Sequence, residues 1–278
     1  MLRFLTAFPS AAVDFYRKGC ASLAASTAFF FLLSFFPLVC LLMFVLGRIL
    51  SEDKAAIGAV FHLLSTFFPN LGIVQSDMAA EILALSSQRG VQGAILAAFV
   101  WAALQVFGEI DYSINVVFEC QKKRNPVTST VASAALLGLT QFVLFVSYIA
   151  TQFSGLVVAY APSVPGLNRA AVAANSLILG RILPLTLASG SVALLFRYLP
   201  RNRPRWGAAV TGALLFVPLW ELAKHLFASY VVNSARFGHM YGSLLGIVLG
   251  LLWIYYSAAL FLFCGAVVHR LQARRRNR

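Results

Sequence analysis

The sequence predicts an all-α fold, a single membrane domain over residues 1–278 in which six transmembrane helices form a bundle with both termini in the cytoplasm. The chain is 60% hydrophobic and only 11% charged, whereas a soluble domain carries roughly 25% charged residues. A helix needs about 20 residues to cross a bilayer. Stretches of 19 or more residues without a charged side chain recur along the chain. This composition argues against a soluble enzyme, a disordered chain and a coiled coil.

The spans follow from the distribution of Asp, Glu, Lys and Arg along the chain. Four stretches that are expected to hold spans contain none of these residues: 19–47, 90–108, 125–168 and 237–268. Two further apolar stretches are interrupted, 170–196 by Arg181 alone and 206–232 by Glu221 and Lys224 alone. The expected spans are about 28–47, 91–110, 131–157, 172–196, 207–230 and 243–268.

The segments between and beyond the spans are also expected to be largely helical. Residues 1–18 have apolar side chains at near-helical spacing, which indicates an amphipathic helix lying on the inner membrane face. Residues 48–89 form a long outer loop with short helices that begin at Ser51 and Ser76, both helix N-cap residues. Its uncharged part, 55–76, is a seventh candidate span interrupted by Pro69 and Gly72, and residues 269–278 form a basic cytoplasmic tail.

The net charge of +13 is distributed unevenly over the loops. In the six-span arrangement, fifteen Lys and Arg lie on the side of the termini and five on the other. Since cytoplasmic loops are enriched in Lys and Arg, both termini are predicted to be cytoplasmic. A seven-span arrangement with the N-terminus outside places fourteen Lys and Arg on the cytoplasmic side and six on the outer side. It ranks second. The basic residues are interpreted as topology determinants that contact anionic lipid headgroups, with no nucleic-acid partner.

No motif of soluble catalysis accompanies these spans. The four cysteines and four histidines lack metal-ligand spacing, and neither a phosphate-binding glycine loop nor a nucleophile elbow is present. Glu109, Asp111 and Glu119 could be grouped as a metal cluster, but they are better interpreted as charges at a helix end. The sequence therefore predicts no enzyme, no metal site and no cofactor.

The charges inside the spans are the candidate functional residues. An ionisable group at mid-bilayer is costly, and it usually faces a partner or a wet cavity. Arg181 and Glu221 each lie 12 residues from the outer end of their span, about 18 Å deep. We hypothesise that they form an ion pair. Lys224 and His225 follow one turn after Glu221, on the same helix face, and complete a predicted substrate or ion pathway.

Prolines accompany these charges. Pro184 follows Arg181 by three residues, Pro218 precedes Glu221 by three, and Pro37 interrupts the first span. Proline kinks a helix, and broken helices with ionisable residues form the binding sites of secondary transporters. The alternative interpretation is a buried ion pair that only fixes helix packing, with the prolines tolerated.

Small residues line one face of the sixth span. Gly242, Gly246 and Gly250 form a G-x-x-x-G-x-x-x-G pattern, which lets another helix approach closely. This face is expected to pack within the monomer, and a homo-oligomer interface is the alternative.

Several short stretches together resemble the YihY/BrkB family of bacterial inner-membrane proteins. The resemblance rests on residues 28–37, AFFFLLSFFP, on the turn RYLP at 197–200, on Trp220-Glu221, and on Tyr241-Gly242-Ser243. It implies six spans with cytoplasmic termini, an inner-membrane location, and a link to virulence and envelope lipid traffic. Some relatives carry a ribonuclease label, which no motif here supports.

The preferred functional hypothesis is a transporter or flippase-like protein for an anionic small molecule or lipid. Its cavity would be lined by the first, fourth and fifth spans. An arginine suits an anionic substrate, and a glutamate or histidine in a span suits proton coupling. The alternative is a non-transporting scaffold for envelope assembly or virulence. A membrane-bound nuclease or hydrolase is the least supported reading.

Overall fold

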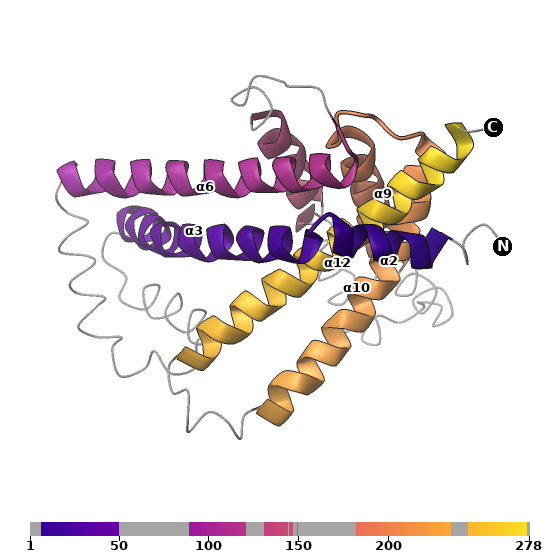
Figure 1. The fold of residues 1–278 in the computed structure, drawn as a ribbon. Helices are drawn as coiled ribbons and strands as arrows, with labels where there is room; N and C mark the ends of the chain where they lie inside the picture. The colour runs from indigo at the N-terminus through magenta and orange to yellow at the C-terminus, as the bar shows by residue number, and fades with distance from the viewer. Residues whose placement is uncertain are drawn as a thin grey trace, which may run out of the picture. The chain divides into compact units, whose positions relative to one another are not determined.

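The computed structural model of the protein describes residues 7–49, 89–120, 131–143, 145–146, 149, 182–234 and 244–276. Every regular element within these ranges is a helix, which confirms the all-α prediction. Figure 1 labels the main helices. They are α2 (Ala7–Arg17), α3 (Cys20–Ile49), α6 (Arg89–Val117), α9 (Leu183–Tyr198), α10 (Trp206–Ser234) and α12 (Leu244–Arg276), and residues 131–143 are helical as well.

Among the described residues, three helices are long and apolar enough to cross a membrane: Gly93–Val117, Trp206–Val231 and Ile247–Ala273. Phe8–Arg17 and Cys20–Phe35 would add a fourth if they were counted as one broken span. Large apolar side chains are exposed along these helices, including Trp101, Leu214 and Leu226. Contiguous apolar surface of this kind is expected where lipid covers a protein.

The other predicted spans are described only in part. Val131–Val143 and Leu183–Tyr198 are shorter apolar helices at the start of span 131–157 and the end of span 172–196. Residues 50–88 of the predicted outer loop 48–89, which hold Ser51, Ser76 and the 55–76 stretch, lie outside the described residues. Six spans and the orientation of the termini therefore remain predictions.

The helix boundaries follow local backbone chemistry. Between α2 and α3, Gly19 adopts a φ of +63°, and the amide of Lys18 donates to the Asp14 carbonyl at 2.9 Å. A glycine in this left-handed conformation is a common helix C-terminal signal. Pro184 occupies the first turn of α9, where proline is well tolerated, whereas Pro37 and Pro218 lie inside α3 and α10.

The chain divides into two compact units. Unit 1 comprises Met1–Cys20, Asp111–Leu222 and Leu260–Arg278, and unit 2 comprises Ala21–Ile110 and Ala223–Ala259. In unit 2, α3 and α6 run side by side, and the Ser26 hydroxyl donates to the Glu109 carboxylate (Figure 1). The rings of Phe227 and Trp253, 5.0 Å apart, join the adjacent parts of α10 and α12.

The core of unit 1 depends on small residues and stacked rings. Phe196 is fully buried and stacks on Phe261, with ring centroids 4.9 Å apart. Gly212 of α10 lies directly against the side chains of Phe196 and Val268, so a methyl group there would collide with them. Gly265 of α12 similarly leaves room for Ile114 of α6. This close packing holds the ends of α6, α9, α10 and α12 in fixed positions.

Candidate functional site

Unit 1 gathers polar and ionic side chains from four places in the sequence. They lie in or just beyond the C-terminal parts of α2, α6 and α12, and in the turn that follows α9. We call this group the helix-end cluster. It comprises Asp14, Lys18, Asp111, Asn115, Glu119, Arg201, His269 and Arg270.

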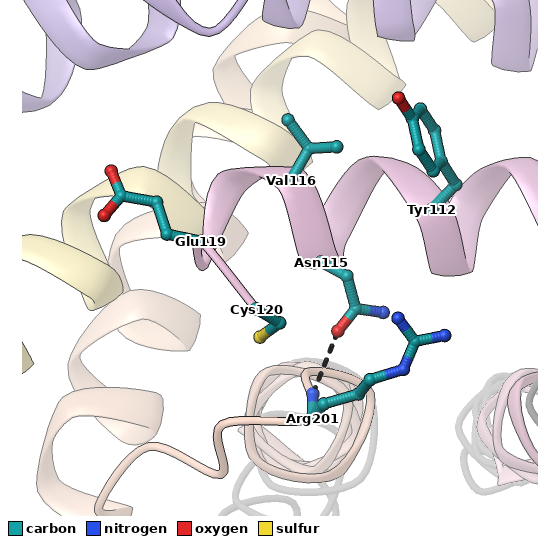
Figure 2. Close-up of a pocket in the computed structure, with 6 residues that line it drawn as sticks. All are labelled: Tyr112, Asn115, Val116, Glu119, Cys120 and Arg201. Carbon is teal, nitrogen blue, oxygen red and sulfur yellow. Dashed lines mark hydrogen bonds between the residues drawn. The ribbon is translucent and has the colours of Figure 1, made fainter. Parts of the chain in front are cut away.

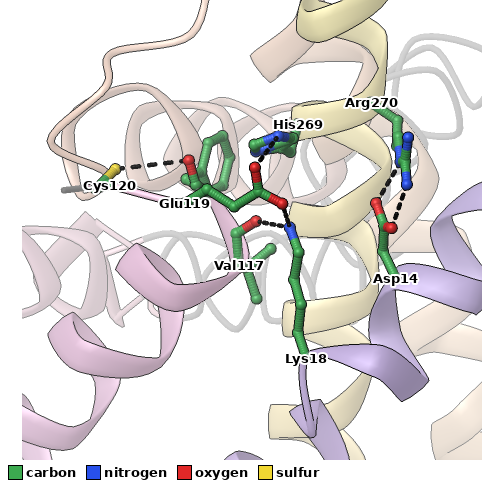
Figure 3. Close-up of polar contacts among 8 residues, drawn as sticks. Asp14, Lys18, Val117, Glu119, Cys120, His269 and Arg270 are labelled. Carbon is green, nitrogen blue, oxygen red and sulfur yellow. Dashed lines mark hydrogen bonds and ion pairs between the residues drawn. The ribbon is translucent and has the colours of Figure 1, made fainter.

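The C-terminus of α6 is closed by a Schellman motif. The amide of Cys120 donates to the Asn115 carbonyl at 3.0 Å, and the amide of Glu119 donates to the Val116 carbonyl at 3.1 Å. Glu119 therefore takes the left-handed position, with φ +52°, that glycine usually fills. A side chain at this position costs about 1 kcal/mol. The motif points the Glu119 carboxylate away from the helix axis and toward Lys18 (Figure 3).

Asp111 is the buried acid of the cluster. Its carboxylate accepts a hydrogen bond from the Ser133 hydroxyl at 2.9 Å and pairs with Arg201 Nη2 at 3.1 Å. Asn115, one turn later, donates from Nδ2 to the Asp111 carbonyl at 2.6 Å and accepts from the Arg201 amide at 3.0 Å. Asp111, Asn115 and Ser133 are all buried. These bonds fix the turn after α9 to α6.

Lys18 connects the α2 end to the α6 end. Its Nζ lies 2.9 Å from Glu119 Oε1 and donates to the Val117 carbonyl at 2.7 Å (Figure 3). A cation at the carbonyl end of a helix also interacts favourably with the helix dipole. The hydrogen bond from Lys18 is the main reason that the pKa of Glu119 lies below its ordinary value. His269 Nε2 lies 3.9 Å from the other oxygen of the same carboxylate.

Asp14 and Arg270 form the second link, between α2 and α12. The guanidinium donates from Nε to one carboxylate oxygen and from Nη2 to the other, which is a bidentate pair (Figure 3). The side chain of Asp14 is 7% exposed and that of Arg270 is 37% exposed. This hydrogen bonding holds the pKa of Asp14 below its ordinary value, against the opposing effect of burial.

A pocket of about 460 Å³ opens beside the cluster. Figure 2 shows its lining residues, Tyr112, Asn115, Val116, Glu119, Cys120 and Arg201. Both of its charged side chains have partners of opposite charge, Arg201 in Asp111 and Glu119 in Lys18. The pocket walls are therefore polar but close to neutral, and no excess of positive charge favours an anion there.

The residues predicted from sequence as a mid-membrane pathway lie on another part of the chain. Glu221 and Lys224 are half-buried on α10 inside the candidate span Trp206–Val231, and His225 on the same helix is exposed. Arg181 lies outside the described residues, so the Arg181–Glu221 ion pair stays a prediction. The role of Arg181, Glu221, Lys224 and His225 in a substrate or ion pathway also stays a prediction.

The predicted glycine face is also described in part. Gly246 and Gly250 lie on α12, and a methyl group at Gly250 would meet nothing within 4 Å in the described part of the chain. Gly242 lies outside the described residues. The close contact predicted for this face, within the monomer or in an oligomer, stays a prediction.

Sequence reasoning missed the helix-end cluster. The sequence predicts Lys18, Arg201 and Arg270 to be topology determinants that contact anionic lipid headgroups, whereas in the structure each pairs with an acid. One signal was available: Asp111, Asn115 and Glu119 recur at intervals of four, a spacing that places polar side chains along one helix face. Of the three acids considered for a metal cluster, Glu109 bonds Ser26, Asp111 pairs with Arg201 and Glu119 pairs with Lys18. No group of three or more metal-ligating side chains occurs among the residues that the structure describes.

Comparison with known proteins places this architecture in a family. A family model described as virulence factor BrkB matches residues 11–278. The chain belongs to the BrkB family. This BrkB-family chain is 27% identical over 233 residues to a UPF0761 membrane protein of Vibrio vulnificus, covering 84% of this chain and 71% of the relative.

Two further relatives of this BrkB-family chain are also named UPF0761 membrane proteins. The one from Photobacterium profundum is 27% identical over 254 residues, which is 91% of this chain and 76% of the relative. The one from Chlorobium luteolum is 26% identical over 252 residues, which is 91% of this chain but 57% of the relative. No solved structure matches the chain. The names of the relatives and the apolar helices agree that this is a membrane protein.

Proposed function

We propose that this BrkB-family protein is a six-span protein of the bacterial inner membrane that moves an anionic small molecule or lipid across the bilayer. Both termini face the cytoplasm, in accord with the distribution of Lys and Arg over the loops. In this arrangement the helix-end cluster lies at the cytoplasmic ends of the spans.

The observation that carries the proposal is the pair of half-buried ionisable residues within α10. Glu221 and Lys224 lie well inside the apolar stretch Trp206–Val231, and Pro218 precedes them in the same helix. Each charge costs about 2.5–3.5 kcal/mol at mid-bilayer on insertion scales. A helix that carries two such groups beside a proline resembles the discontinuous helices of transporter sites. Arg181, at a similar predicted depth, would add the positive charge that an anion requires.

The experiment is reconstitution of the full chain into liposomes. Transfer of fluorescent phosphatidylglycerol and phosphatidylcholine between leaflets would be followed by chemical quenching from outside, and uptake would be measured for a panel of organic and inorganic anions. We expect transport of at least one anionic species, with phosphatidylcholine moved more slowly. Absence of flux for every lipid and anion would refute a transport role.

A matched pair of variants locates the pathway. Glu221→Gln removes the acid within the span and is expected to slow transport tenfold or more. Glu109→Gln removes an acid whose partner is the Ser26 hydroxyl, and transport is expected to stay within twofold of wild type. If both variants transported equally well, Glu221 would have no part in the pathway.

A second candidate, a non-transporting envelope scaffold, is favoured by the helix-end cluster itself. Its ion pairs link α2 to both α6 and α12, as expected of a rigid platform for partner proteins. In that case the liposome assay would show no flux, whereas loss of the protein from cells would still weaken the envelope. Transport activity in the purified protein would exclude this reading as the whole function.

A further inference from the structure

The turn between α9 and α10, residues 197–206, is unusually basic and aromatic. Its sequence is RYLPRNRPRW, which places four arginines and two large aromatic residues within ten positions. We call it the basic–aromatic turn. Pro200 and Pro204 are fully buried, and the amide of Asn202 donates to Cys120 Sγ at 3.4 Å. The turn is therefore held firmly by its own backbone and by the end of α6.

Two of the four arginines serve this internal structure. Arg197 donates to the Pro204 carbonyl, and its guanidinium lies 5.8 Å from the centre of the Trp206 ring. Arg201 pairs with Asp111, as described above. Both guanidinium groups therefore interact with other residues of the fold.

The other two arginines point outward. Arg203 and Arg205 are exposed, and within the described residues neither takes part in an ion pair. Arg203 lies 5.7 Å from the centre of the Tyr198 ring, which helps to hold its position. Tyr198 and Trp206 form an edge-to-face pair at 6.0 Å and are 45% and 47% exposed. The turn thus presents two cations that pair with no acid among the described residues, beside two half-exposed rings.

The position of the turn along the chain indicates what it faces. Trp206 is the first residue of the candidate span Trp206–Val231. The turn therefore lies where a membrane helix leaves the hydrocarbon, at the depth of the lipid headgroups. Tyrosine and tryptophan concentrate at this depth because their rings are apolar and their tips are polar, and arginines beside an anionic leaflet are attracted to it. The turn lies at headgroup depth on either face of the membrane, because this depth follows only from its position at the end of the candidate span.

We propose that the basic–aromatic turn is a binding site for anionic phospholipid, with Arg203 and Arg205 holding the headgroup phosphate and Tyr198 and Trp206 at the level of the upper acyl chains. Charge complementarity favours this occupant. The neighbouring pocket is less suited, because both of its charges are neutralised by partners. The proposal requires only that α10 spans the membrane and does not depend on transport.

The test is lipid retention by the full-length protein purified in detergent, measured by native mass spectrometry. Phosphatidylglycerol and phosphatidylcholine are titrated separately, and inorganic phosphate is added in a third arm at matched ionic strength. We expect phosphatidylglycerol to bind more tightly than phosphatidylcholine and to stay bound when phosphate is added. Arg203→Gln and Arg205→Gln should each weaken phosphatidylglycerol binding by about fivefold, the effect of losing one cation near an anionic surface.

Two control variants make the outcome decisive. Arg17→Gln removes one exposed charge from α2 and should change binding by less than twofold. A double lysine variant, R203K/R205K, keeps both charges and should retain the lipid. Unchanged binding in R203Q and R205Q, an equal loss in R17Q, loss in the lysine variant, or displacement of the lipid by inorganic phosphate would each overturn the proposal. Circular dichroism of every variant checks that the helices are intact.

Discussion

The Asp14–Arg270 pair gives the sharpest test of the packing in unit 1, because its two members differ in burial. Removing one partner of a fully buried ion pair costs about 3–5 kcal/mol, whereas an exposed pair contributes about 0–1 kcal/mol. Arg270→Ala strands the Asp14 carboxylate, which is 7% exposed. We expect a loss of about 2–4 kcal/mol, moderated by the nearby charge of Lys18. Asp14→Asn leaves a guanidinium that is 37% exposed and can be hydrated, so its cost should be about 1–2 kcal/mol.

The pH dependence of this loss has a definite sign. Arg270 lowers the pKa of Asp14 in the folded protein below the ordinary 3.8. The resulting stabilisation is fully present above the unfolded-state pKa and is lost as the pH falls through the lower, folded-state pKa. At low pH the protonated Asp14 no longer needs a cation. The difference between wild type and Arg270→Ala should therefore be largest near neutral pH and shrink below about pH 4.

The assay is thermal unfolding of the detergent-solubilised protein, followed by circular dichroism at pH 7 and pH 3. Unfolding of such proteins is often irreversible, so all variants are compared at one scan rate. Arg270→Ala should lower Tm more than Asp14→Asn at pH 7. A larger loss of Tm in Asp14→Asn, or an Arg270→Ala defect as large at pH 3 as at pH 7, would contradict this prediction.

Three further predictions use the same measurement. Gly212→Ala should cost about 1–3 kcal/mol because its methyl group meets closely packed side chains, whereas Gly207→Ala on the same helix meets open space and should be neutral or stabilising by up to about 1 kcal/mol; equal Tm values would refute the packing described. Asn115→Ala removes two hydrogen bonds from a buried site and should cost about 1–3 kcal/mol, a result that an unchanged Tm contradicts. Glu119→Gln breaks a pair whose acid is 65% exposed, so a loss above about 1 kcal/mol would be unexpected.

The helices were predictable because lipid imposes a simple rule on sequence. An uncharged stretch of about 20 residues has few alternatives to a membrane helix. The stretches 90–108 and 206–232 accordingly correspond to α6 and α10. The helices extend further than the predicted spans, since α6 continues to Val117 and α12 to Arg276. Hydropathy marks the apolar part of a helix, whereas the backbone continues until a motif such as that at Glu119 ends it.

The helix-end cluster was not predictable in the same way. A lysine or arginine beside a span has the same sequence signature whether it is solvated or paired. Lys18 and Glu119 are about a hundred positions apart, and only the packing of α2 against α6 and α12 brings them together. The four-residue spacing places Asp111 and Asn115 on one face of α6, and Glu119 follows beyond the helix end. The partners of these side chains come from tertiary structure. Arg181 lies outside the described residues, so its place in a mid-membrane pathway rests on the sequence alone.

The Asp14–Arg270 pair joins residues 256 positions apart, and this separation has a consequence for biogenesis. At about 5–20 residues per second, the ribosome makes Arg270 roughly 13–50 s after Asp14. During that time α2 lacks its α12 partner, and of its two ionic links only the one from Lys18 to the end of α6 can form. A chain that stops before Arg270 would retain its apolar helices but leave Asp14 without its counter-ion. The Asp14–Arg270 pair is therefore one of the last ionic contacts of unit 1 that the growing chain can make.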